Sequence, residues 1–182
     1  KAAGTAALPE AAMQRDAGAS PAVVRRAAAG VLLLSGPLMF CVLGDLFVIR
    51  VAGNIVSPSQ VGSVEFAAER FGTRLVVVLG HSQCGAVLAS LEELERPSKN
   101  RSPNLGFIVN SIVPNVEPLY SAGGAVDRPV LVRRAVRANI SASAEHLRHG
   151  SELLERLIRE NGLLVIGAEY SLETGEVDFF DG

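Results

Sequence analysis

The sequence predicts an α/β protein with a mostly parallel central β-sheet flanked by helices. Short apolar runs alternate with stretches of helical periodicity, which is the pattern of right-handed βαβ crossovers. The length of 182 residues allows one domain with a sizeable core. A composition of 48% hydrophobic and 20% charged residues is typical of a globular chain and argues against disorder. We therefore expect residues 1–182 to form a single domain.

The N-terminal part, residues 1–30, is expected to be a helical arm. It is rich in alanine, and Pro9, Gly18 and Pro21 divide it into short pieces. We expect two amphipathic helices whose apolar face packs either on their own domain or on a second subunit.

The middle of the chain is expected to supply strands and helices in alternation. The apolar run over residues 31–34 is expected to be a strand that ends at a Ser-Gly-Pro turn. Residues 45–54 are expected to form a second strand, which also ends in a turn. Helical periodicity then covers residues 60–70. Residues 75–79, Leu-Val-Val-Val-Leu, give the strongest strand signal, and they lead through a short glycine-containing turn into an expected helix over 86–95.

The C-terminal half is expected to be helical and to end in a β-hairpin. The expected helices cover residues 104–113, 129–149 and 151–160. A strand over 163–170 follows, and the turn at 173–176 leads back into a strand over 177–180.

Charge and hydropathy exclude several classes of partner. Seventeen Lys and Arg residues stand against nineteen Asp and Glu, which gives a formal net charge of −2 and no concentrated positive field for nucleic acid or anionic membranes. The apolar runs are shorter than the roughly 20 residues that cross a bilayer. We therefore expect a protein that binds no nucleic acid and no membrane. Because no secretory signal pattern is present, we also expect it in the cytoplasm.

His81 and Cys84 are the candidate metal ligands. In open α/β sheets, ligands bind beyond the carboxyl ends of the strands, which is where this pair lies. A spacing of three residues places an imidazole and a thiol on one side of a strand-to-helix turn, and Gly80 and Gly85 permit a tight backbone there. Nitrogen and sulfur donors favour zinc, and a helix N-terminus favours thiolate at Cys84. The alternative is a capping histidine beside a small buried cysteine.

Two further groups of residues are expected to be surface features. His146 and His149 lie three apart on an expected helix beside charged neighbours, so we expect a solvated face rather than a second metal site. A basic patch of arginines on the same helix is expected to form ion pairs or a subunit surface, because no glycine-rich phosphate loop accompanies it. The patch consists of Arg133, Arg134 and Arg137.

Several ordered blocks of the sequence resemble the β-class carbonic anhydrases. Residues 44–54 (GDLFVIRVAGN), 62–67 (GSVEFA) and 76–87 (VVVLGHSQCGAV) are similar to successive blocks of that family. Residues 165–170 (VIGAEY) and 174–177 (TGEV) are similar to its closing strands. The resemblance covers most of the chain.

The resemblance implies a carbonic anhydrase-like lyase that interconverts CO2 and bicarbonate by zinc-bound hydroxide. In this family zinc is held by two cysteines and one histidine, with water or an aspartate in the fourth position. His81 and Cys84 match the family's His-x-x-Cys ligands. A homo-oligomer, a dimer or a tetramer, is expected.

The chain departs from the family at the motif Cys-x-Asp-x-Arg, which follows the first core strand in the family and is absent here. Cys41 is the only other thiol that could complete the zinc ligands, and its alternative role is that of a small hydrophobic side chain. No residue can be carried over as the missing Asp or Arg, so we expect impaired activity. Two other interpretations stay open: a non-catalytic homologue that acts as an oligomerising or ligand-binding module, and an internally shortened version of an ordinary enzyme.

Overall fold

The computed structural model describes residues 46–98, 100–122 and 127–181. The expected helical arm, the expected strand over 31–34 and Cys41 therefore lie outside the described residues. The chain divides into two units, Lys1–Val48 and Ile49–Gly182, and the fold below belongs to the second.

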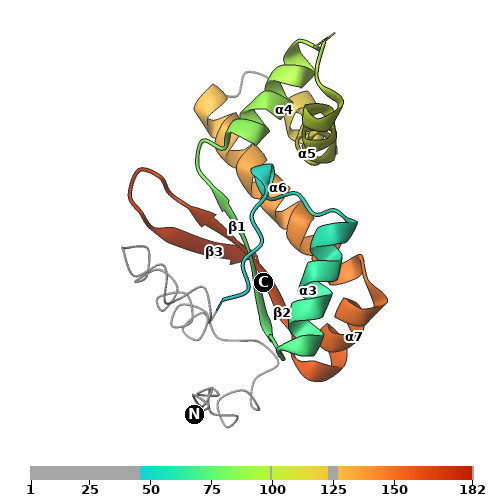
Figure 1. Ribbon diagram of the computed structural model, residues 1–182. Helices are drawn as coiled ribbons and strands as arrows, with labels where there is room; N and C mark the ends of the chain where they lie inside the picture. Colours follow the sequence, from blue (N-terminus) through green and yellow to red (C-terminus); the bar gives the residue numbers. More distant parts are fainter. Residues whose placement is uncertain (1–45, 99, 123–126, 182) are drawn as a thin grey trace, which may run out of the picture. The chain divides into compact units, whose positions relative to one another are not determined.

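This unit combines helices with a small β-sheet, which confirms the predicted α/β class (Figure 1). In chain order they are η2 Ala52–Asn54, α3 Pro58–Arg70, β1 Leu75–His81, α4 Gly85–Glu95, α5 Pro103–Ala122, α6 Arg128–His149, α7 Glu152–Asn161, β2 Leu164–Tyr170 and β3 Val177–Asp181.

The described strands form one sheet in the order β1-β2-β3. Strands β1 and β2 are parallel, with a register that runs from Leu75 opposite Leu164 to His81 opposite Tyr170. Strands β2 and β3 form the predicted C-terminal antiparallel hairpin. Because β1 and β2 are parallel, their carboxyl ends lie at the same edge of the sheet, where His81 meets Tyr170.

Helix α6 packs along one face of the sheet (Figure 1). Its Ile140 side chain lies close to two glycines of the strands. A Cβ atom on Gly80 of β1 would lie 2.5 Å from Ile140 Cδ1, and one on Gly167 of β2 would lie 3.0 Å from Ile140 Cγ2. The same helix buries Val136, Ile140 and Ala144 almost completely. Small residues in the strands thus let α6 approach the sheet.

Local sequence signals define the helix ends. Ser57 and Gln60 form a capping box at the start of α3, and Pro58 occupies the first helical position. Ser151 Oγ accepts a hydrogen bond from the Leu154 N–H at the start of α7, and Gly162 ends that helix in the left-handed conformation.

The prediction of a strand over residues 45–54 is wrong for its described part. Residues 46–51 belong to no strand, and Ala52–Asn54 form the 3₁₀ turn η2. Gly53 and Asn54 both have positive φ, 68° and 43°, which a continuous strand excludes. An apolar run favours extended backbone, but a strand also needs a pairing neighbour, and no described strand pairs with this segment.

The predicted end of the helix over 104–113 is too early. Helix α5 continues through Pro114 and Pro118 to Ala122. Its buried stripe, Val109, Ile112 and Val116, extends past the first proline and packs with α4 and α6. The packing of that stripe offsets the backbone hydrogen bonds that proline cannot make.

None of the helices in the described ranges combines the length and hydropathy that a membrane span requires.

The turn at Gly53 yields a test of the packing around η2. A Cβ atom on Gly53 would lie 2.6 Å from Ile112 Cδ1 and 3.0 Å from Ala86 Cβ, whereas nothing lies within 4 Å of a Cβ atom on Gly72, which has the same φ of 68°. We expect Gly72→Ala to lower the free energy of unfolding by about 1 kcal/mol through backbone strain alone. Gly53→Ala should cost about 1–3 kcal/mol more because of the clash with the core. Equal losses in urea unfolding would contradict this packing.

Candidate functional site

The predicted metal ligands lie together in the turn that joins β1 to α4. His81 is the last residue of β1, and Cys84 is the N-cap residue of α4. Only Ser82 and Gln83 separate them. The structure thus brings His81 and Cys84 to the carboxyl edge of the sheet, as the sequence predicted.

His81 is oriented by a hydrogen bond to the backbone. Its Nδ1 lies 2.9 Å from the carbonyl oxygen of Ser82. Because a carbonyl oxygen only accepts, Nδ1 is the donor in this bond, and in the corresponding neutral tautomer the lone pair lies on Nε2. This is the arrangement by which a second hydrogen bond fixes the tautomer of a metal-ligating histidine.

Cys84 supplies a sulfur atom at the start of α4. The residue is 5% exposed, and its side chain makes no capping hydrogen bond to the helix. Its carbonyl oxygen accepts from the Leu88 N–H at 2.9 Å, so the backbone of Cys84 is fixed by the first turn of α4.

A hydrogen bond to strand β2 fixes the backbone of the turn. The Ser82 N–H donates to the carbonyl oxygen of Tyr170 at 2.9 Å, which continues the β1–β2 pairing one residue past the end of β1. Gln83 has a φ of 54°, in the left-handed region that residues with a Cβ seldom adopt.

The turn also contacts the loop between β2 and β3. Ser82 Oγ donates to Glu173 Oε2 at 2.7 Å and accepts from the Leu172 N–H at 2.9 Å. Gln83 Nε2 donates to the other carboxylate oxygen, Oε1. The Ser82 hydroxyl, the backbone N–H of Glu173 and the Gln83 amide together lower the pKa of the Glu173 carboxyl to about 2.

A buried network of amides fixes η2 beside this edge of the sheet. Asn139 of α6 is fully buried; its Nδ2 donates to the carbonyl oxygen of Gly53 at 2.7 Å, and its Oδ1 accepts from Asn115 Nδ2 at 3.0 Å. Asn54 Nδ2 donates to Ser143 Oγ at 3.3 Å. We did not predict this network from the sequence, although an asparagine within the apolar stripe of a helix is a signal of a buried partner.

The donor set at the turn is incomplete within the described residues. His81 and Cys84 offer nitrogen and sulfur, which fit part of the coordination shell that zinc prefers. No group of three or more His, Cys, Asp or Glu side chains that could hold a metal occurs in residues 46–98, 100–122 and 127–181. A third protein ligand would therefore come from outside these ranges, where Cys41 lies, and its predicted role stays a prediction.

The two histidines of α6 lie on the surface, and Arg137 forms an ion pair, both as predicted. His146 and His149 are exposed, and His149 lies 3.3 Å from Glu145 Oε2 and 3.5 Å from Glu155 Oε1. Arg137 pairs with Glu169 at 2.8 Å. Its guanidinium carbon lies 4.4 Å from the centre of the Phe180 ring.

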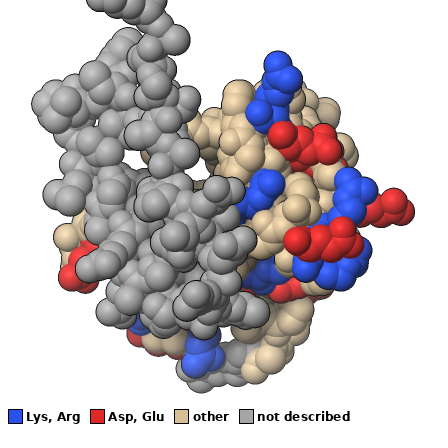
Figure 2. Space-filling model, turned by 90° about the horizontal axis from the view of Figure 1, so that it is seen from below, with Lys and Arg blue, Asp and Glu red and all other residues tan. Residues whose placement is uncertain are grey.

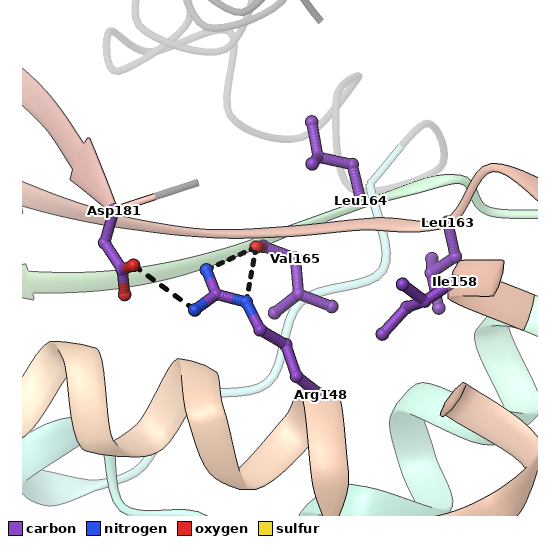
Figure 3. Close-up of a pocket in the computed structure, with 6 residues that line it drawn as sticks. All are labelled: Arg148, Ile158, Leu163, Leu164, Val165 and Asp181. Carbon is purple, nitrogen blue, oxygen red and sulfur yellow. Dashed lines mark hydrogen bonds and ion pairs between the residues drawn. The ribbon is translucent and has the colours of Figure 1, made fainter. Parts of the chain in front are cut away.

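A separate pocket lies between the end of α6, α7 and the start of β2 (Figure 3). Arg148 reaches into it, and its Nε and Nη2 donate to the carbonyl oxygen of Val165 at 3.1 and 2.7 Å. Arg148 Nη1 pairs with Asp181 Oδ1 at 3.2 Å. Val165 lies near the start of β2, whereas His81 pairs with Tyr170 at the other end of that strand, so the pocket is distinct from the turn of His81 and Cys84.

Known proteins resemble this chain over most of its length. The family model for carbonic anhydrase matches residues 37–177. Carbonic anhydrase 2 of Mycobacterium tuberculosis is 31% identical over 133 residues, which cover 73% of this chain and 61% of that protein. The chain thus spans about three fifths of the length of this curated relative.

Solved structures share the fold. A β-carbonic anhydrase of Aspergillus fumigatus, CafA, has a TM-score of 0.68 and 23% identity, and the match covers 83% of this chain and 68% of that one. A tetrameric β-carbonic anhydrase of Sordaria macrospora has a TM-score of 0.64 and 20% identity, with 86% of this chain and 93% of that chain covered.

The contacts of Glu173 predict how its carboxyl titrates. Because the folded pKa of about 2 lies below the ordinary value of 4.5, these contacts contribute stability fully above pH 4.5 and lose it as the pH falls toward 2. In a ¹³C NMR titration, the Glu173 carboxyl should stay ionised at a pH where an ordinary glutamate is half protonated. Ser82→Ala should raise its midpoint. A midpoint near 4.5 in the unsubstituted chain would contradict the contacts.

Proposed function

The chain belongs to the β-class carbonic anhydrase family, and from this membership we propose that it binds zinc through His81 and Cys84 and catalyses the reversible hydration of CO2 to bicarbonate. The observation that carries the proposal is the turn after β1. There the Ser82 carbonyl fixes the tautomer of His81, and a buried sulfur without a capping bond lies three residues away.

These residues have separate tasks in the proposed site. The lone pair of His81 Nε2 and the sulfur of Cys84 hold the ion, while the Nδ1–H of His81 stays on the Ser82 carbonyl. Zinc, when bound, supplies the Lewis acidity that lowers the pKa of water from 15.7 to about 7 and so makes it a nucleophile toward CO2 at neutral pH.

We propose Cys41 as the third protein ligand. It is the only other thiol in the chain, and zinc of this family takes two cysteines and one histidine. Cys41 precedes residue 44 and is not part of a Cys-x-Asp-x-Arg motif. The Asp and Arg of that motif, which orient the reacting groups in the family, therefore have no counterpart in this chain. Since the loss of groups that orient the ligands costs about 10–100-fold in affinity or activity, we expect activity below that of a relative that has the motif.

The proposed enzyme is a homo-oligomer, a dimer or a tetramer, located in the cytoplasm. Val77 and Leu79 of β1 are 39% and 49% exposed on the face of the sheet opposite Gly80, which supports burial of this face against a second copy. The Sordaria macrospora relative is tetrameric. On the described surface in Figure 2, positive and negative side chains are intermixed, in keeping with a protein that binds no nucleic acid.

A second candidate function is that of a non-catalytic homologue, an oligomerising or ligand-binding module. The observation that favours it is the two-donor set of the described residues together with the missing motif. This candidate retains the packing of α6 on the sheet but requires no metal.

Zinc content and CO2 hydration separate the two candidates. We expect the purified chain to hold one zinc ion per subunit and to accelerate CO2 hydration in a stopped-flow assay. A chelated sample should lose the acceleration and regain it when zinc is restored. Metal-free protein that shows no turnover above buffer after incubation with zinc would support the non-catalytic homologue.

Single substitutions test the ligands. Cys84→Ser and Cys41→Ser should each lower zinc content and abolish turnover, because each removes a thiolate donor. His149→Ala is the control, since His149 is 69% exposed and pairs with Glu145 and Glu155. Zinc content that is unchanged in Cys41→Ser would remove Cys41 from the site, and unchanged content in Cys84→Ser would place the metal elsewhere.

A further inference from the structure

We propose that Glu173 is a positioning residue for the metal site: its carboxylate holds Ser82 and Gln83, the two residues between the ligands, so that His81 and Cys84 face one ion. The inference rests on the proposed zinc site, and it adds a residue from the far end of the chain to that site.

Each oxygen of the Glu173 carboxylate accepts a hydrogen bond from a different residue of the turn. Oε2 accepts from Ser82 Oγ at 2.7 Å, and Oε1 accepts from Gln83 Nε2. Every residue between the two ligands is thus bound to the same side chain, 90 residues away in the sequence. Hydrogen bonds to an ionised acceptor are the stronger kind.

The loop that carries Glu173 is itself arranged to present the carboxylate. Ser171 Oγ donates to Glu173 Oε2 at 3.1 Å and accepts from the Thr174 N–H at 3.1 Å. The Leu172 N–H donates to Ser82 Oγ, so that this hydroxyl both accepts from and donates to the loop. The contact is a closed network rather than a single exposed bond.

The backbone of the turn gives the network a task. Gln83 adopts a φ of 54°, a conformation that persists in a residue with a Cβ only where its surroundings determine it. The Gln83 side chain is exposed, so packing in the core does not hold this residue in place. The hydrogen bond from Gln83 Nε2 to Glu173 fixes its side chain instead. Relaxation of Gln83 would rotate the peptide that leads into Cys84 and change the distance between the sulfur and the imidazole.

Glu173 has no comparable role in the core. Its side chain is exposed, so its removal should leave the core intact and act on the turn and on its own loop, where Ser171 Oγ also donates to it. Glu176, which lies in the same loop between β2 and β3, provides a matched control. It is also exposed, and its carboxylate interacts with Thr174 Oγ1 at 3.5 Å but with neither Ser82 nor Gln83.

The first test needs no metal. We would measure the alkylation rate of Cys84 in the zinc-free chain by mass spectrometry of the peptide that contains it, which separates it from Cys41. Because local opening of the turn exposes the buried sulfur, Glu173→Ala should raise the rate several-fold, whereas Glu176→Ala should not. Equal rates in the two variants would overturn the proposal that Glu173 holds the turn.

The second test uses the metal alone. Zinc affinity from competition with a chromophoric chelator should fall about 10-fold in Glu173→Ala, as is typical when a group that orients ligands is lost. The thiolate-to-metal absorption of the Co²⁺-loaded chain should change as well, while Glu176→Ala should match the unsubstituted chain in both readouts. Unchanged affinity and an unchanged cobalt spectrum in Glu173→Ala would overturn the positioning role.

A double substitution tests whether the effect passes through Ser82. If Glu173 acts through this hydroxyl, Ser82→Ala should weaken zinc binding, and the loss in Ser82→Ala/Glu173→Ala should be smaller than the product of the two single losses. Fully multiplicative losses would contradict the network. An unsubstituted chain that binds no zinc would overturn the proposed function, whereas the alkylation comparison still decides separately whether Glu173 holds the turn.

Discussion

The close contact between α6 and the carboxyl end of β1 is the constraint on which the rest of the site depends. Gly80 has no room for a side chain because Ile140 occupies the space where a Cβ atom would lie. The last residues of β1 are thereby held between α6 and the paired strand β2. From this fixed point only Ser82, Gln83 and Cys84 lie between His81 and the start of α4 at Gly85. The turn therefore sets the positions of the imidazole and of the Cys84 sulfur.

Two polar networks lie on different sides of this region, one around η2 and one at the turn itself. On the buried side, Asn139 satisfies the carbonyl of Gly53 and fixes η2 against α5 and α6. On the exposed side, Glu173 binds Ser82 and Gln83, which lie between His81 and Cys84. A buried amide without partners is costly, so the first network ties η2 to the fold. The second network lies in water, and it therefore affects the geometry of the turn more than the stability of the whole unit.

The sequence predicts those features whose signals are local. The strand over residues 75–79 and the helices around it were predicted because apolar runs and helical periodicity appear within a few residues of one another. The end of α5 was predicted wrongly because a proline is read locally as a stop, while the buried stripe through Val116 is decided by α4 and α6. Residues 46–51 illustrate the same limit, since whether an extended segment becomes a strand depends on a distant neighbour. The contact between Glu173 and the turn spans 90 residues and leaves no periodic signal at all.

Family membership favours a zinc enzyme, whereas the missing motif favours weaker activity or none. The blocks that match the β-carbonic anhydrases include the His-x-x-Cys turn but not the motif that supplies the other thiolate. Zinc K-edge X-ray absorption on the zinc-loaded chain tests most directly whether sulfur and imidazole bind the metal. Binding by His81 and Cys84 predicts sulfur at about 2.3 Å together with imidazole nitrogen at about 2.0–2.1 Å from the metal. A shell of oxygen and nitrogen without sulfur would contradict it.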